Sequence, residues 1–312
     1  MGWSRWAVLI VGFLVSGCTT QVGGAALPDP AYAPPKRVSS TSTDLLGTAN
    51  TLDPCSLLDP AALSQFGTPQ QTEQESYDYC WLKLPLGSTT VAVRFGLLER
   101  VRGELRAKEI EPVGALRVFE ENPAKDRCAR YILFSDNVTM IVSADTYESP
   151  GASVPQLCSI TEKTTTTIAE NVAARKVTHF TFPASSLGRV DPCKVVTVAL
   201  AQVPGLPTGE VISYPGQHQC RWGLAMVPSL TVRFVLGTPA TAPEVRQETI
   251  AGRQTGVYPV NVAGRSVCVA ELKHGTGREL AQVLVRLPAG NTEAACAALR
   301  IVAAEAWTKL PA

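Results

Sequence analysis

The sequence has almost no net charge. Its 312 residues contain 28 Lys and Arg against 27 Asp and Glu, which gives a formal charge of +1. A chain without a positive field has no sequence-independent attraction for nucleic acid, so we expect no nucleic-acid partner. Charged residues make up 18% and apolar residues 45%, a composition that excludes a disordered chain and a coiled coil. The length is typical of about two globular domains.

Catalytic motifs are also lacking. The sequence contains no G-x-S-x-G, H-E-x-x-H, G-x-x-x-x-G-K-[ST] or G-x-G-x-x-G. Its three histidines, His179, His218 and His274, share no spacing, and we expect all of them to be exposed. No C-x-x-C pair is present, so a metal site is not expected. The sequence therefore predicts no enzyme, no metal and no cofactor.

The first residues read as an export signal. Arg5 precedes the run 6–15, which is apolar or Gly throughout and rises about 15 Å as a helix, half of the roughly 30 Å needed to cross a bilayer. Val15-Ser16-Gly17-Cys18 resembles the lipobox of bacterial lipoproteins. The resemblance implies that residues 1–17 are removed and that Cys18 carries a lipid anchor, which places the protein on the outer face of the cell membrane.

Residues 18–50 are expected to form a flexible tether behind this anchor. They contain four prolines and three glycines, together with a Ser/Thr cluster at 39–43, and show no hydrophobic period. Such a segment holds the folded part away from the lipid.

The remaining eight cysteines form an internal repeat. The second four lie 138 to 140 residues after the first four, and Asp-Pro-Cys, Cys-(x)-Trp and Val-Arg-Phe recur in the same order. This spacing indicates a tandem duplication, with units at 51–174 and 189–312 and a linker at 175–188. Exported cysteines in even number predict disulfides, and four per unit allow three pairings. We favour Cys55 with Cys80, Cys128 with Cys158, Cys193 with Cys220, and Cys268 with Cys296.

Each unit is expected to be α+β: a helix, several antiparallel strands, and a closing helix. Asp-Pro pairs predict N-terminal helix caps at Asp53, Asp59 and Asp191, and Thr197 stands where Asp59 stands in the first unit. Alternation predicts half-buried strands at 91–95 and 230–234. Hairpins are predicted around 135–137 and 274–277, and a closing helix at 292–309.

These motifs resemble a family of actinobacterial envelope lipoproteins found in mycobacteria and their relatives. The resemblance rests on Asp-Pro-Cys opening a short helix, the Cys-Trp pair, Gly264-Arg265 before Cys268, and Cys296-Ala297-Ala298 in the last helix. The common domain of that family has no assigned function. The resemblance implies an exported, anchored and disulfide-bonded protein, and it assigns no catalytic residue.

Four side chains are candidates for ligand binding. Trp81 and Trp222 are interpreted either as a ligand platform or, more often for a Trp beside a disulfide, as core. Arg94 and Arg233 are on the solvent face of their strands, where they either bind an anionic group or are solvated. A recurring pair of acids, Asp53 and Asp191, is better explained by capping than by an acidic site.

The first functional hypothesis is a non-enzymatic binding module, with a groove between the units for an envelope protein, lipid or wall component. The alternatives are a sensory module that modulates a membrane protein and, last, a cryptic envelope hydrolase.

Overall fold

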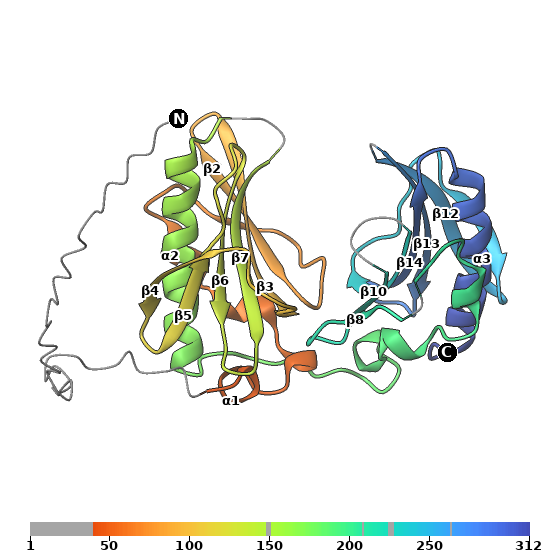
Figure 1. The fold of residues 1–312 in the computed structure, drawn as a ribbon, viewed down its shortest axis with the longest axis horizontal. Coiled ribbons are helices and arrows are strands. Elements are labelled where there is room, and N and C mark those ends of the chain that lie inside the picture. The colour runs from red at the N-terminus through yellow and green to blue at the C-terminus, as the bar shows by residue number, and fades with distance from the viewer. Residues whose placement is uncertain (1–39, 148–150, 208, 224–227, 263) are drawn as a thin grey trace, which may run out of the picture. The chain divides into compact units, whose positions relative to one another are not determined.

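The computed structural model describes residues 40–147, 151–207, 209–223, 228–262 and 264–312. The predicted signal peptide, Cys18 and most of the predicted tether lie outside these residues. Over the described residues the chain forms two seven-stranded antiparallel sheets. Each sheet is covered on one face by one long helix (Figure 1). We call residues 40–174 the first half and residues 189–312 the second half.

The first sheet has the strand order β1-β2-β3-β7-β6-β5-β4. Its strands are β1 (Gln70–Gln71), β2 (Cys80–Leu86), β3 (Thr89–Arg100), β4 (Lys108–Val113), β5 (Leu116–Glu120), β6 (Arg127–Leu133) and β7 (Val138–Tyr147). The predicted hairpin between β6 and β7 is present, and Asn137 takes the left-handed conformation that the turn requires, with φ 58°.

The second sheet has the order β11-β12-β13-β14-β10-β9-β8, which is the order of the first sheet read from its other edge. Its strands are β8 (Val211–Ser213), β9 (Gln219–Trp222), β10 (Ser229–Leu236), β11 (Arg246–Ile250), β12 (Arg253–Val262), β13 (Arg265–His274) and β14 (Glu279–Pro288). The two halves are thus similar units. They contain more strand than the predicted α+β class implied.

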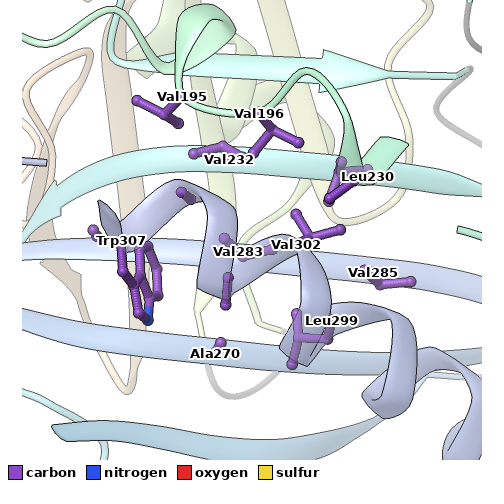
Figure 2. Packing of buried hydrophobic residues seen from close by; sticks show 14 of the residues in the cluster. Val195, Val196, Leu230, Val232, Ala270, Val283, Val285, Leu299, Val302 and Trp307 are labelled. Atoms are coloured by element: carbon purple, nitrogen blue, oxygen red, sulfur yellow. The ribbon is translucent and has the colours of Figure 1, made fainter. Parts of the chain in front are cut away.

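Each core lies between a sheet and its helix. Helix α2 (Val154–Ala173) packs on β6 and β7, and helix α3 (Thr292–Thr308) packs on β13 and β14. The second core is drawn in Figure 2, where Leu299, Val302 and Trp307 of α3 contact the apolar row of the strands. Each large core takes one face of its strands, because side chains alternate along a strand, and Val267, Val269 and Leu284 form a smaller apolar cluster on the other face of the second sheet.

Helix α2 accommodates a run of threonines that has poor helix propensity. The hydroxyls of Thr161, Thr164 and Thr165 are buried and donate to the carbonyl oxygens of residues four earlier, at 2.7 to 2.9 Å. Thr161 also donates to Cys128 O at 3.1 Å, across to the sheet. The polar groups are therefore satisfied inside the helix, so their burial does not break it.

The cysteines pair as favoured from the sequence. Among the described residues there are four disulfides, Cys55–Cys80, Cys128–Cys158, Cys193–Cys220 and Cys268–Cys296. In each half the first disulfide joins the opening turn to the sheet, and the second joins a central strand to the long helix.

The predicted opening helix is wrong in both halves. The Asp-Pro pairs begin short 3-10 turns instead: η2 (Pro54–Leu57) and η3 (Pro60–Leu63) in the first half, and η5 (Pro192–Lys194) in the second. Asp53, Asp59 and Asp191 do cap these turns, each accepting from the N–H two residues later. A helix cannot continue from one pair to the next because Pro60 lacks an N–H and disfavours helical geometry at the preceding residue.

The predicted tether, residues 18–50, extends too far towards the C-terminus. Residues 42–50 belong to the folded first half, since α1 (Ser42–Leu46) has a capping box at Thr41 and buries Leu46 completely. A further 3-10 turn, η1 (Ala49–Thr51), follows directly. The hydroxyl of Ser42 donates to Asp136 at 2.6 Å, which ties α1 to the β6–β7 turn.

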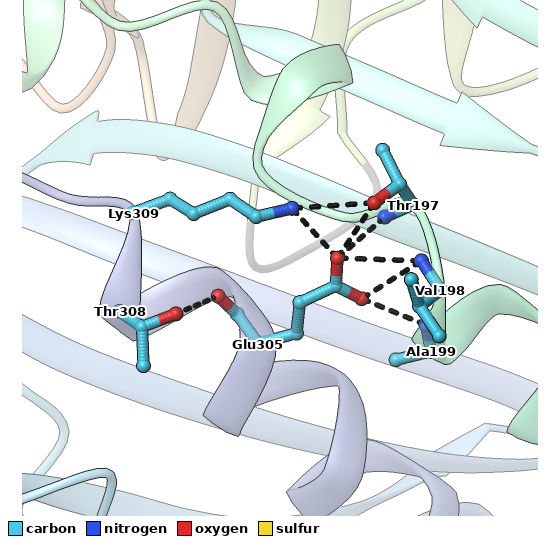
Figure 3. A network of polar contacts seen from close by, with 6 residues as sticks. All are labelled: Thr197, Val198, Ala199, Glu305, Thr308 and Lys309. Atoms are coloured by element: carbon cyan, nitrogen blue, oxygen red, sulfur yellow. Dashed lines mark hydrogen bonds and ion pairs between the residues drawn. The ribbon is translucent and has the colours of Figure 1, made fainter.

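Thr197 is not the cap that the sequence predicts. The turn η6 (Ala199–Gln202) follows Val198, which makes no side-chain cap, and Glu305 of α3 supplies the acceptor from 106 residues away (Figure 3). Its carboxylate accepts from the N–H groups of residues 197–199 at 2.7 to 3.3 Å and from Lys309 Nζ at 2.6 Å. Burial raises the pKa of Glu305, but these hydrogen bonds outweigh it and lower the pKa to about 2.

No helix in the described ranges is both long and apolar enough to cross a membrane.

Candidate functional site

The two halves are joined by a docking segment, residues 73–79, which leaves the first sheet and contacts the second half. Both halves belong to one compact unit, Val38–Ala312. Tyr77 is 3% exposed and packs within the second core. Its hydroxyl donates to Glu279 Oε1 at 2.7 Å, and the other oxygen of Glu279 accepts from Leu187 N at 2.9 Å. The residues predicted as a linker therefore pack against the junction.

Two of the three histidines are buried at this junction, which corrects the expectation that all three are exposed. His218 is 1% exposed, with Nδ1 at 2.8 Å from Asp78 Oδ1 and Nε2 at 3.3 Å from Gly188 O. His274 is 5% exposed and has Nε2 at 2.7 Å from Ser185 O. His179 is exposed, as predicted. Sequence spacing could not show this, because each partner lies 30 to 140 residues away.

A cavity of about 300 Å³ is lined by both halves. From the first sheet it is lined by the end of β3, the residues after it, and side chains of β6 and β7. From the second half it is lined by β8 and β9. Its polar lining residues include Glu99, Tyr131, Thr139, Ser213, Tyr214 and Arg221.

Three carboxyls, those of Glu99, Glu104 and Glu121, and four guanidiniums, those of Arg100, Arg102, Arg106 and Arg221, line this cavity. Burial raises the pKa of Glu99, and Arg221 opposes that rise. Burial likewise raises the pKa of Tyr131 and of Tyr214, so both hydroxyls keep their protons at neutral pH. Nε of Arg221 is buried without a hydrogen-bond partner among the described residues. A buried donor without a partner costs free energy, and a ligand acceptor would remove that cost.

The two candidate tryptophans lie on opposite faces of their sheets. Trp222 is 2% exposed and belongs to the second core, so it is not a ligand platform. Trp81 is opposite Arg94 on the face of the first sheet that α2 does not cover, which we call the helix-free face. The ring centroids of Trp81 and Tyr147 are 5.5 Å apart. The extra residue in Cys220-Arg221-Trp222 explains the difference. It brings Trp222 onto the core face and leaves Arg221 on the face that Trp81 occupies in the first sheet.

Arg94 and Arg233 both lie on helix-free faces, as alternation predicts. Arg94 Nη1 forms an ion pair with Asp145 Oδ2 at 3.0 Å, on a face that also holds Arg127. Arg233 Nε donates to a neutral acceptor, Gln282 Oε1, at 2.6 Å. The first arginine is therefore compensated, whereas the second is held by an amide.

Further arginines join Arg233 on the second sheet, and the sequence reasoning missed them. Arg286 is half-buried, and its pKa is lowered by burial and then by Arg233, Arg221 and Arg265. The alternation of Gln282, Leu284 and Arg286 with apolar residues in β14 is the signal that could have placed Arg286 on this face.

No metal-binding arrangement is found in the part of the chain that the structure describes, where no three His, Cys, Asp or Glu side chains come together. Asp53 and Asp191 are engaged as caps in different halves, as the capping interpretation predicts.

Comparisons with known proteins give no family. No family model matches the chain, and no curated protein matches it. Among solved structures, a Tle4–Tli4 complex chain has 7% identity and a TM-score of 0.21, over 73% of this chain and 87% of that one. The immunity protein TplEi of the T6SS of Pseudomonas aeruginosa has 8% identity and a TM-score of 0.21, over 78% and 95%. DynU16, from the dynemicin biosynthetic locus, has 14% identity and a TM-score of 0.15, over 82% and 93%. Likenesses of this size assign neither fold nor function.

Proposed function

We propose that this chain is an exported, lipid-anchored and non-enzymatic binding module of the cell envelope, and that its ligand lies in the junction cavity. The observation that carries the proposal is the cavity itself. It is lined by both halves, and Arg221 Nε and the Glu99 carboxyl lie in it without an ion pair between them. A volume of about 300 Å³ is at the lower end of the range for small-molecule sites.

The donors and acceptors in the cavity favour a polar ligand. Two protonated tyrosine hydroxyls, those of Tyr131 and Tyr214, donate or accept, and Arg221 donates. No Cys, His or Lys is among the lining side chains, and the Tyr131 hydroxyl, although hydrogen-bonded to Glu121, keeps its proton, so binding is the chemistry that they support best.

The export part of the proposal has independent support. Four disulfides form and persist in oxidising compartments, which agrees with a signal peptide over residues 1–17 and with the lipobox at Cys18. The shared strand order and disulfide positions also support the inference that the two halves arose by tandem duplication.

Native mass spectrometry of the protein, purified from its own membranes in mild detergent, tests the binding function. We expect the wild-type chain to carry a small bound mass that Arg221→Gln loses. Arg117→Gln is the matched control, because it removes the same charge from an exposed arginine that pairs with Glu109. A bare wild-type protein, or a bound mass that both variants keep, contradicts the proposed site.

Anchoring is tested separately by Cys18→Ser. This variant is expected in the soluble fraction, because it lacks the sulfur that carries the lipid. Persistent membrane association of Cys18→Ser would contradict the lipobox.

A further inference from the structure

The two histidines buried at the junction have different sets of hydrogen-bond partners. His218 lies between β8 and β9 and is 1% exposed. Its Nδ1 is 2.8 Å from Asp78 Oδ1 of the docking segment, and its Nε2 is 3.3 Å from Gly188 O. His274 has Nε2 at 2.7 Å from Ser185 O, whereas its Nδ1 has no hydrogen-bond partner among the described residues. Both ring nitrogens of His218 are therefore engaged, and only one of His274.

Both partners of His218 are acceptors, since a carboxylate and a backbone carbonyl have no proton to donate. A neutral imidazole carries one proton, so the nitrogen without it would present a lone pair to an acceptor. Only the imidazolium, with a proton on each nitrogen, donates to Asp78 and to Gly188 together. The opposite holds for His274. Its neutral form with the proton on Nε2 already donates to Ser185 O, and a second proton would be a buried donor without an acceptor.

We propose that His218 is held as an imidazolium that links the two halves, and that its deprotonation loosens the junction. We call the group formed by Asp78, Gly188 and His218 the histidine clasp. Asp78 belongs to the first half and His218 to the second, so their ion pair joins the halves. Loss of the proton removes the bond to Gly188 O and leaves the Asp78 carboxylate, which is 9% exposed, without its cation. Both changes are costly at buried groups.

Three buried tyrosines surround the clasp, and all three are neutral. Burial, followed by the hydrogen bond to Glu279, raises the pKa of Tyr77, whose ring centroid is 4.8 Å from that of His218. Burial also raises the pKa of Tyr79 and of Tyr214, and the charge of Asp78 adds to the rise in both. Protonated tyrosines carry no charge that could replace Asp78 as the partner of the imidazolium.

The charged side chains on the elements around His218 have other contacts or face solvent. They are Glu73, Glu75, Arg189, Arg233, Arg278 and Glu279. Glu279 accepts from Tyr77 and from Leu187 N, Arg278 pairs with Glu73, and Arg233 donates to Gln282. Glu75 and Arg189 are exposed. In the part of the chain that the structure describes, Asp78 is the only carboxylate that pairs with the His218 ring.

The sign of the pH dependence follows from the proton that the clasp needs. A histidine in an unfolded chain gives up its proton near pH 6.5. Below that pH the ring is charged in both states, and the clasp contributes its full stabilisation. Above it the unfolded chain has released the proton, and the stabilisation is lost as the folded ring releases it too. The junction is therefore tight at low pH and loose at high pH.

The clasp has a consequence for the junction cavity. Tyr214 and Arg221 line the cavity and flank His218 in the sequence, so a loosened junction is expected to weaken binding there. This consequence rests on the proposed binding function, whereas the clasp itself does not. Its tests therefore use no ligand, and a protein that carries no bound mass in native mass spectrometry leaves them unchanged.

Nuclear magnetic resonance of the detergent-purified full chain, labelled with 15N and 13C at histidine, tests the proton assignment. The His→Gln variant of each histidine assigns its ring signals. At about pH 6 the His218 ring is expected to show two protonated nitrogens, and titration to about pH 9 is expected to remove one proton. A His218 ring that is neutral at pH 6, or one that stays charged at pH 9, overturns the proposal.

Hydrogen exchange measures the loosening itself. Leu236 N donates to Glu75 O at 3.1 Å, so this amide reports on the contact between the docking segment and β10. Its protection factor, corrected for the intrinsic pH dependence of exchange, is expected to fall about tenfold from pH 6 to pH 9, the effect of losing a charge-assisted bond. Asp78→Asn is expected to have low protection at both pH values.

His179→Gln is the matched control for this measurement. It removes an exposed histidine whose Nδ1 lies 3.0 Å from Thr51 Oγ1, and it is expected to show the same fall as the wild type. Protection in the wild type that does not change with pH would overturn the proposal. A fall of wild-type size in Asp78→Asn would do so as well, because the carboxylate would then have no part in it.

Discussion

The helix-free faces of the two sheets differ in charge although their central strands pair in the same way. Arg94 is opposite Ser143 in the first sheet, and Arg233 is opposite Gln282 in the second. Two residues beyond these partners, the first sheet has Asp145 and the second has Leu284. Asp145 pairs with Arg94 at 3.0 Å and lies 3.7 Å from Arg127.

One position thus separates an arginine paired with a carboxylate from an arginine held by an amide. Two residues further on, Tyr147 of the first sheet corresponds to Arg286 of the second, and the acid of the second face, Glu271, lies on β13 opposite Gln282. Both faces lie away from the large cores under the helices, and Val267, Val269 and Leu284 form a smaller apolar cluster on the second. This difference teaches that a repeated scaffold can keep its core rows and still carry different charged side chains on the two copies.

The largest expected difference in stability between the halves concerns their two tryptophans. Trp222→Ala is expected to lower the free energy of unfolding by about 3–5 kcal/mol, because it opens a cavity in the second core. Trp81→Ala is expected to cost about 2 kcal/mol, since Trp81 packs on the helix-free face against Tyr147 and Lys83. Urea unfolding of both variants measures this, and equal losses would contradict the assignment of Trp81 to that face.

The disulfides provide a test in which the halves are expected to behave alike. Cys128–Cys158 spans 30 residues and Cys268–Cys296 spans 28, so loop closure predicts nearly the same stabilisation, about 3–4 kcal/mol each. The two double Cys→Ser variants are compared by denaturant unfolding. A difference of more than about 1 kcal/mol between them would mean that the two helices do not close equivalent units.

Local patterns predicted the parts of the fold that depend on neighbouring residues. Alternation located the strands containing Val93 and Val232, and turn residues located the hairpins. The repeat of the cysteines favoured the pairing that is found. The opening helices were wrong because the Asp-Pro pairs were interpreted as caps of α-helices, whereas the turns that they begin are short 3-10 turns, the first of which ends before Pro60.

Long-range features were not predictable from such patterns. Tyr77 and Glu279 meet across 202 residues, and no period relates them. Of the candidate site, Arg233 was placed correctly by alternation, whereas Arg286 was overlooked in a strand with the same pattern. Whether an arginine on a solvent face is paired depends on residues of other strands, which a single strand pattern does not contain.

The opening turns of the two halves are capped by acceptors that lie at different separations along the sequence. Asp59 caps its own turn in the first half, whereas Glu305 of α3 reaches the turn of the second. Glu305→Gln is expected to cost about 2 kcal/mol, because it weakens several charge-assisted bonds, and Asp59→Ala about 1 kcal/mol. Urea unfolding at pH 7 compares the two, and a larger cost for Asp59→Ala would contradict this ranking.

The cap of the second half also has a predicted pH dependence. The folded pKa of Glu305 is about 2, below its ordinary value of 4.5. Its contribution to stability is therefore complete above about pH 4.5 and is lost as the pH falls towards 2. The difference in unfolding free energy between the wild type and Glu305→Gln should shrink over that interval. A difference that stays constant from pH 7 to pH 2 would exclude the charged cap.

The smallest expected effect on stability is the most direct test of the charge difference between the faces. Asp145→Asn removes the carboxylate from the first face, and we expect a loss of about 1 kcal/mol, because the ion pair with Arg94 is half-exposed. The variant should resemble the second sheet in one respect, since Arg94 then lacks its carboxylate partner, while Arg127 keeps Glu121 at 3.8 Å. Added phosphate is therefore expected to raise the melting temperature of Asp145→Asn more than that of the wild type, with chloride at equal ionic strength as the control. If phosphate raises both melting temperatures equally, the charge of Asp145 does not account for the difference between the two faces.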